Sequence, residues 1–128
     1  MKPMAVEWAR KAEGDFATME RESRARKAPN YDGICFHAQQ CAEKYLKARV
    51  SEAGIAFAKT HDLVALLEQT LVVEPHWERF RKDLAFLSDF AMSFRYPGES
   101  ADRESAKDSQ RRCRRFRLAA RQTLDLDA

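Results

Sequence analysis

The chain has 128 residues, a formal net charge of +3, and only four glycines and four prolines. A chain of this length buries an adequate core without disulfides or a metal, and it fits one domain covering residues 1–128. The segments between the glycines and prolines are rich in residues that favour helix, and no long alternation of β-branched and polar residues occurs. The composition therefore excludes a sheet protein and predicts an all-α fold.

Neither a membrane segment nor a secretory signal is expected. No stretch approaches the roughly 18 consecutive apolar residues of a membrane span, and residues 1–7 lack the apolar core of a signal peptide. We therefore expect a cytoplasmic protein. The cysteines are odd in number and fall on apolar faces of predicted helices, which indicates buried thiols in a reducing compartment. They are Cys35, Cys41 and Cys113.

The first predicted helix covers about residues 4–26. Its apolar stripe, spaced at helical intervals, consists of Ala5, Trp8, Ala9, Ala12, Phe16 and Met19. Pro29 cannot continue a helix, and either Asn30 or Asp32 is suited to cap the next one.

The second predicted helix, at residues 34–50 and ending near Gly54, is the segment around which the chain is organised. Its apolar stripe contains Ile34, Ala38, Cys41, Ala42, Tyr45 and Leu46. Two polar lines flank this stripe, one with Gln39, Glu43 and Lys47, the other with His37, Gln40, Lys44 and Lys47. The simplest interpretation is a solvated flank with a Glu43–Lys47 pair, and the alternative is the edge of a groove.

A short third helix is expected at residues 63–71, with Thr60 as its N-cap and Asp62 in its first turn. His61 would then lie in the first turn as well, where the helix dipole favours a neutral ring. Two roles remain open for this histidine, a hydrogen-bonded tether between two helices and a member of a binding site.

The fourth predicted helix begins at Pro75 and carries a wide apolar face of Trp77, Phe80, Leu84, Phe86, Leu87, Phe90, Ala91 and Phe94. This much aromatic surface indicates a central helix that also contributes to a dimer interface. The helix is expected to stop at Arg95, because Pro97 disfavours the α conformation at Tyr96 and Gly98 allows a turn. Arg95 has donors suited to phosphate or carboxylate, or to the carbonyls at the helix end.

The last predicted helix covers about residues 102–124. It buries Ala106, Cys113, Phe116, Ala120 and Leu124 and carries a face rich in arginine. Such a face is either a solvated exterior or a surface that attracts phosphates, including weak RNA binding, or an acidic partner. Together the segments predict an up-and-down four-helix bundle with an additional short helix.

Three stretches together resemble the HEPN family, named for nucleotide binding in higher eukaryotes and prokaryotes. They are Cys35-Phe36-His37-Ala38-Gln39-Gln40-Cys41-Ala42-Glu43-Lys44-Tyr45-Leu46-Lys47-Ala48, Thr60-His61-Asp62-Leu63 and Arg95-Tyr96-Pro97. The resemblance extends from about Trp8 to the last helix. It implies a bundle of four to five helices, a homodimer, and a gene often found beside one for a small nucleotidyltransferase.

The resemblance implies two functional classes. In the RNase class, an arginine and a histidine separated by four to six residues act together across a dimer. Arg95 matches that arginine, but Ser100, Ala101 and Asp102 stand where the histidine would fall. We therefore expect a module that binds an ATP-like nucleotide or a nucleotidyltransferase partner, as in a two-gene toxin–antitoxin-like system, with a metal-independent RNase toxin centred on Arg95 as the alternative. The candidate nucleotide-binding residues are Gln40, Lys44, Lys47, His61, Arg95 and Tyr96.

No cofactor or metal is expected. His37 and Cys41 lie one helical turn apart with Cys35 nearby, but two ligands on one turn are too few for a site, and no paired cysteine motif completes the set. No glycine-rich phosphate loop and no nucleophile elbow occur. A nucleotide would therefore be held by side chains in a groove or in a dimer cleft.

Overall fold

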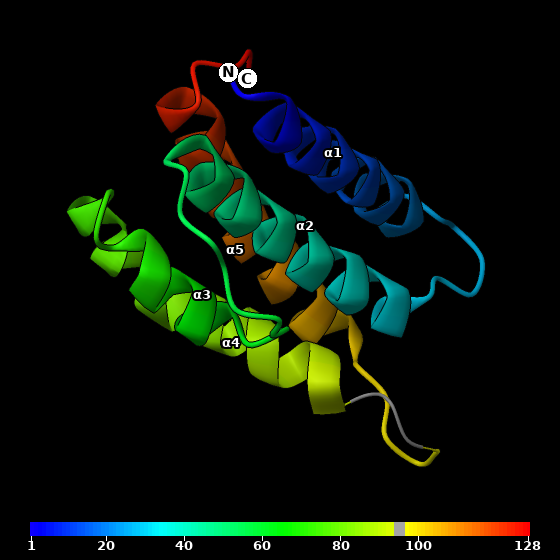
Figure 1. The fold of residues 1–128 in the computed structure, drawn as a ribbon. Coiled ribbons are helices and arrows are strands. Elements are labelled where there is room, and N and C mark those ends of the chain that lie inside the picture. Colours follow the sequence, from blue (N-terminus) through cyan, green and yellow to red (C-terminus); the bar gives the residue numbers. More distant parts are fainter. Residues whose placement is uncertain (94–96) are drawn as a thin grey trace.

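The structure, a computed structural model, describes residues 1–93 and 97–128, with the backbone alone for residues 90–93. All regular elements in these ranges are helices, as predicted (Figure 1). They are α1 (Pro3–Ser23), α2 (Tyr31–Glu52), α3 (Leu63–Thr70), a 3-10 helix η1 (Pro75–Phe80), α4 (Arg81–Ser93) and α5 (Arg103–Thr123). The arrangement is a helical bundle with one extra short helix, α3.

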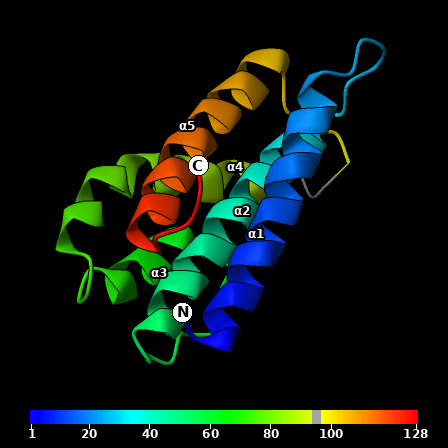
Figure 2. The same ribbon diagram turned by 90° about the horizontal axis from the view of Figure 1, so that it is seen from above.

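The helix α2 is the centre of this bundle, in agreement with the sequence analysis. It packs against α1, α3, α4 and α5, and two views show α1 and α5 running alongside it (Figures 1 and 2). The predicted apolar stripe of α2 is fully buried. However, Gln39, Glu43 and Lys47 are buried too, with 4, 3 and 8 % of their surfaces exposed, so the interpretation of this line as a solvated flank is wrong. Because α2 packs against four other helices, it buries polar positions that would be exposed on a helix with only one buried face.

Both ends of α2 have well-formed caps. The Asn30 side chain accepts a hydrogen bond from the backbone N–H of Gly33, which confirms one of the two predicted caps. At the other end, the N–H of Gly54 bonds to the carbonyl of Ser51, and the N–H of Ile55 bonds to that of Val50. Gly54 has φ = +75°, a conformation that suits glycine and ends the helix in a Schellman motif.

The helix α3 begins at Leu63, as predicted, but its N-cap lies two residues later than expected. Its N-cap is Asp62, whose carboxylate accepts hydrogen bonds from the N–H groups of Val64 and Ala65. Thr60 instead accepts from the N–H of Asp62, in the loop. His61 accordingly precedes the helix and does not lie in its first turn. A carboxylate is at least as good an N-cap as a threonine hydroxyl, so the later residue takes the position.

The segment predicted as one helix from Pro75 consists of η1 followed by α4. Trp77 and Phe80 are buried, and both rings meet Phe116 of α5 edge to face, at centroid distances of 5.1 and 5.3 Å. Phe86 is half-buried against the core. Phe94, Arg95 and Tyr96 lie outside the described residues, so the aromatic dimer surface stays a prediction. Gly98, in the turn that follows, has φ = +91°.

The last helix begins after Asp102, whose side chain accepts from the N–H of Ser105. All five apolar residues predicted to be buried on α5 are buried. The three cysteines are buried free thiols, as expected. In the described ranges, no helix has both the length and the apolar character needed to cross a membrane.

Candidate functional site: a polar strip on the central helix

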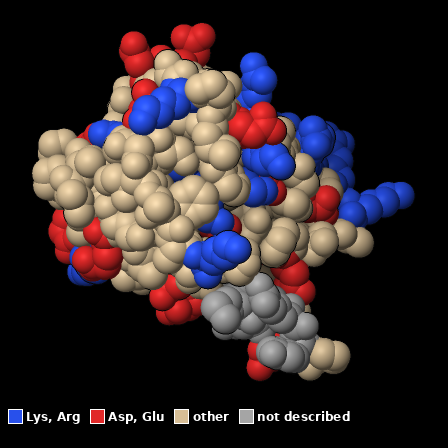
Figure 3. Space-filling view, viewed as in Figure 1, with Lys and Arg blue, Asp and Glu red and all other residues tan. Residues whose placement is uncertain are grey.

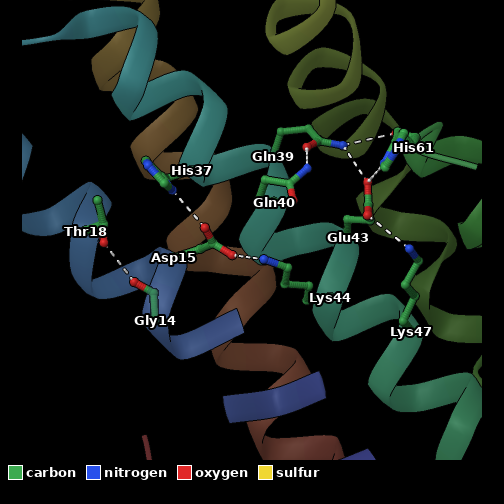
Figure 4. A network of polar contacts seen from close by, with 10 residues as sticks. All are labelled: Gly14, Asp15, Thr18, His37, Gln39, Gln40, Glu43, Lys44, Lys47 and His61. Atoms are coloured by element: carbon green, nitrogen blue, oxygen red, sulfur yellow. Dashed lines mark hydrogen bonds and ion pairs between the residues drawn. The ribbon is translucent and has the colours of Figure 1, made fainter. Parts of the chain in front are cut away.

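Only one narrow part of α2 reaches solvent along its middle, between Ile34 and Ala48. We call it the α2 strip, and it consists of Phe36, His37, Gln40 and Lys44. Phe36 is the most open, with 45 % of its surface exposed, and its ring meets the His37 ring edge to face at 5.2 Å. Two networks of polar contacts flank this strip, one toward α1 and one toward α3 (Figure 4).

The network toward α1 is centred on Asp15. One carboxylate oxygen of Asp15 lies 2.7 Å from Nδ1 of His37, and the other lies 2.5 Å from Nζ of Lys44. The Asp15 side chain is only 11 % exposed. A carboxylate at Nδ1 fixes the orientation of the imidazole and favours the tautomer with the proton on that nitrogen. Nε2 of His37 is then the ring nitrogen left to accept a hydrogen bond.

The network toward α3 is centred on the buried carboxylate of Glu43. One of its oxygens contacts Nε2 of Gln39 at 3.1 Å and Nδ1 of His61 at 2.9 Å, and the other accepts from Nζ of Lys47 at 3.1 Å. The Gln39 amide also donates to the backbone carbonyl of His61. Gln40 extends the network to the strip, because its amide donates to the Gln39 oxygen at 2.7 Å.

Lys47 is enclosed by aromatic rings. Its ammonium nitrogen lies 5.0 Å from the ring centroid of Trp8 on α1 and 5.3 Å from that of Phe57 in the loop after α2. These two rings meet edge to face, at 5.6 Å. Glu43 and the ring faces together compensate the charge of a side chain that is only 10 % exposed. Lys47 thus ties α1, α2 and the following loop together.

The structure brings together three of the residues expected at the site and separates a fourth. Gln40, Lys47 and His61 belong to the network around Glu43, whereas Lys44 turns to Asp15. The tether role considered for His61 is present, although 67 % of its side chain is exposed. Arg95 and Tyr96 fall outside the described residues, and their roles stay predictions.

Two residues of the site escaped the sequence analysis. Asp15 comes from α1, in a stretch without a recognisable motif, and it is separated from His37 by 22 positions. Phe36 lies inside the motif, but its position next to the apolar stripe gave no sign that it would be exposed. The one sequence signal for Asp15 was that it places a carboxylate at the edge of the apolar stripe of α1.

The connection that carries Arg95 and Tyr96 returns to the start of α2. A carboxylate oxygen of Asp32, in the first turn of α2, accepts a hydrogen bond from the N–H of Ala101 at 2.6 Å. Earlier in α4, the hydroxyl of Ser88 accepts from the N–H of Leu63 at the start of α3. Ala101, after this connection, is thus tied to α2, and Ser88, five residues before the end of α4, is tied to the start of α3.

The arginines of α5 are mostly engaged within the chain. Arg117 pairs with Glu13 at 2.6 Å, and Arg114 pairs with Glu20 at the same distance. Burial acts to raise the pKa of Glu13, but hydrogen bonds from Arg117 and Tyr45 outweigh it, and the pKa falls below its ordinary value. The basic face is therefore largely neutralised by acidic residues of the same chain. Weak RNA binding by this helix stays a prediction.

The described cavities lie elsewhere on the surface. Five cavities are lined by described residues outside the α2 strip and its two networks. In the same ranges, no group of three or more His, Cys, Asp or Glu side chains is arranged to hold a metal ion. The strip is an open surface with fixed donors and acceptors.

Comparison with known proteins gives one result for this chain. The family model described as the HEPN domain matches residues 5–122. Searches of curated proteins and of solved structures found no significant match. The matched segment includes the α2 strip, both flanking networks and the connection between α4 and α5.

Proposed function

The chain belongs to the HEPN family, and from this we propose that it is a module that binds an ATP-like nucleotide without cleaving RNA. The observation that carries the proposal is the missing histidine. Glu99, Ser100, Ala101 and Asp102 follow the Arg95-Tyr96-Pro97-Gly98 turn, and none of them can act as an imidazole acid or base.

The three histidines of the chain lie at positions 37, 61 and 76, so none follows Arg95 at the spacing of the RNase class. His37 and His61 each have Nδ1 on a carboxylate, of Asp15 and Glu43 respectively, with both carboxylates nearly buried. His76 is the third, and it contacts Glu74 at 3.4 Å on η1. The carboxylates of Asp15 and Glu43 fix the rings of His37 and His61 as parts of polar networks, whereas His76 is exposed.

The α2 strip has the chemistry to hold a nucleotide. The exposed ring of Phe36 offers a stacking surface for a base, and Gln40 keeps a carbonyl oxygen and one N–H outside its bond to Gln39. Lys44 supplies an ammonium group at the edge of the strip. Arg95 and Tyr96 would contribute a phosphate contact and a second stacking surface. In this arrangement Lys47 and His61 act indirectly, by holding Glu43 and Gln39 in place.

Calorimetric titration with ATP, GTP and a short RNA tests the proposal. We expect saturable nucleotide binding at the α2 strip that is lost in Arg95→Ala and weakened in Gln40→Ala. Lys82→Ala, which removes an exposed charge on α4, should bind like the wild type. Each variant must first give a wild-type circular dichroism spectrum. Absence of nucleotide binding by the wild type would contradict the proposal, and metal-independent RNA cleavage that Arg95→Ala abolishes would establish the RNase alternative.

We also propose that the protein forms a homodimer and works with a small nucleotidyltransferase, as in a two-gene toxin–antitoxin-like system. The support is family membership together with the aromatic excess of the α4 sequence. Light scattering after size exclusion gives the oligomeric state. Co-expression with a nucleotidyltransferase encoded beside this gene, followed by co-purification, tests the pairing. A monomer at micromolar concentration, or a partner that does not co-purify, would contradict the corresponding part.

A further inference from the structure

A cavity of about 350 Å³ lies at the end of the bundle where α1 ends and α2 and α5 begin. Its cationic lining residues are Arg26, Arg103 and Lys107, and Tyr31 and Ile34 form part of its wall. Lys and Arg side chains also gather on this side of the molecule, over the second half of α1 and the loop after it (Figure 3). The volume falls within the range of small-ligand pockets, roughly 300 to 1,000 Å³.

The cations of this cavity differ from the other basic residues of α5. Six arginines of that helix pair with carboxylates of the chain, namely Arg111, Arg112, Arg114, Arg115, Arg117 and Arg121. In the described part of the chain, Arg26, Arg103 and Lys107 form no such pair. The described residues that line the cavity also include no carboxylate. The lining of the cavity therefore carries positive charge and no negative charge.

The positions of two of these cations are unfavourable within the isolated chain. Arg103 is the first residue of α5 and lies at the positive end of the helix dipole, and Lys107 follows four residues later. Like charges at this spacing also repel each other along a helix. A bound anion would offset this repulsion, because it attracts both side chains.

Three carboxylates at this end of the bundle have other partners. Glu20 accepts from Arg114, Glu22 accepts from the N–H of Asn30, and Asp102 caps α5. Glu104 lies in the shallow hollow beside the cavity and does not line it. The chain therefore does not supply a counter-charge inside the cavity.

We propose that this cavity binds the phosphate groups of a small phosphorylated ligand of nucleotide size. Arg26, Arg103 and Lys107 contact the phosphates, and Tyr31 and Ile34 contact the remainder of the ligand. The proposal goes beyond the function proposed above, because the α2 strip does not line this cavity.

Titration with inorganic pyrophosphate and with AMP, followed by calorimetry at low ionic strength, tests the cavity. We expect saturable pyrophosphate binding that is about tenfold weaker in Arg103→Ala and in Lys107→Ala, because each loses a charge-assisted hydrogen bond, and undetectable in the double variant. In the double variant AMP should keep only the binding that belongs to the α2 strip. Arg111→Ala is the matched control, since it removes a charge from the same helix outside the cavity. Circular dichroism must show that every variant is folded.

Several outcomes would overturn the proposal. The first is that the wild-type protein binds neither probe, and the second is that the folded double variant binds like the wild type. The third is that Arg111→Ala lowers the affinity as much as Lys107→Ala does, which would indicate diffuse attraction to the basic surface. Binding of a 5′-phosphorylated RNA without binding of AMP or pyrophosphate would also overturn it. Gln40→Ala separates the two sites, because it impairs the α2 strip and leaves binding in the cavity unchanged.

Discussion

Glu43 and Lys47 form an ion pair, 3.1 Å between Oε2 and Nζ, in which the two side chains are only 3 and 10 % exposed. Burial of two charges is costly unless each has further partners. Here Gln39 and His61 satisfy the second oxygen of Glu43, and two aromatic rings cover the ammonium group of Lys47. The pair is therefore part of the packing of α2 against its neighbours.

Removal of one partner should destabilise the protein strongly. Glu43→Ala leaves Lys47 as an unpaired buried charge, and we expect the free energy of unfolding to fall by about 3 to 5 kcal/mol. Urea denaturation followed by circular dichroism measures the change. The double variant Glu43→Leu with Lys47→Met should recover much of the loss, because an apolar pair of similar volume avoids the cost of desolvation.

The exposed pair of Glu78 and Arg81 is the natural control. Both side chains are at least 36 % exposed, so solvent screens their attraction, and Glu78→Ala should have a much smaller effect than Glu43→Ala. Equal losses of stability in Glu78→Ala and Glu43→Ala would mean that burial does not strengthen the Glu43–Lys47 pair.

The cap of α3 gives a second prediction. Asp62→Ala removes the acceptor for the N–H groups of Val64 and Ala65 and should lower stability by about 1 kcal/mol. Thr60→Ala removes only a loop hydrogen bond and should cost less. Thermal unfolding of both variants shows which substitution lowers stability more. A larger loss in Thr60→Ala would mean that Thr60, and not Asp62, caps α3.

The helices were largely predictable because apolar spacing is a local property. The buried stripes of α2 and α5 followed from intervals of three and four residues, and Asn30 was identified as a cap by its side chain. The burial of Gln39, Glu43 and Lys47 was not predictable in this way. It depends on how many helices surround α2, which the periodicity of one helix does not encode. The same intervals also fail to separate a 3-10 turn at Pro75 from an α-helix.

A third prediction concerns acid stability. Hydrogen bonds from Arg114 lower the pKa of Glu20 below its ordinary value of 4.5, although burial acts in the opposite direction. The folded state thus binds the proton less tightly than the unfolded chain, and this stabilisation is full above pH 4.5 and is lost as the pH falls through the lower folded pKa. Glu20→Gln should be less stable than the wild type at neutral pH, with a difference that shrinks below about pH 4.5. Urea denaturation across the pH range measures it, and a difference independent of pH would contradict the assignment.

A fourth prediction addresses the anchor of the connection before α5. Asp32→Ala removes the acceptor for the N–H of Ala101, so hydrogen exchange at that amide should accelerate. Asp32→Asn keeps an acceptor oxygen and should exchange more slowly than the alanine variant. Amide exchange measured by NMR distinguishes them. Exchange at Ala101 that is unchanged in both variants would mean that this bond does not hold the connection.

The candidate site was predictable in part. Gln40, Lys47 and His61 share one network, as their place on two neighbouring motifs indicated. Lys44 turned to Asp15 because α1 lies on that side of α2, and no motif marks Asp15. Contacts between helices depend on how the helices are oriented, and a side chain at the border of two interfaces can turn to either.

The order of the helices along the chain matters during synthesis. α1 and α2 are neighbours in sequence and pack along their length, so they can pair once both have left the ribosome. α5 emerges only after α3 and α4, and in the finished fold Ser109 of α5 contacts the thiol of Cys35 at 3.4 Å. Until α5 arrives, the side of α2 that carries Cys35 is uncovered. In the nascent chain, before α5 arrives, the Cys35 thiol therefore lacks the hydrogen bond and the cover that α5 supplies in the finished fold.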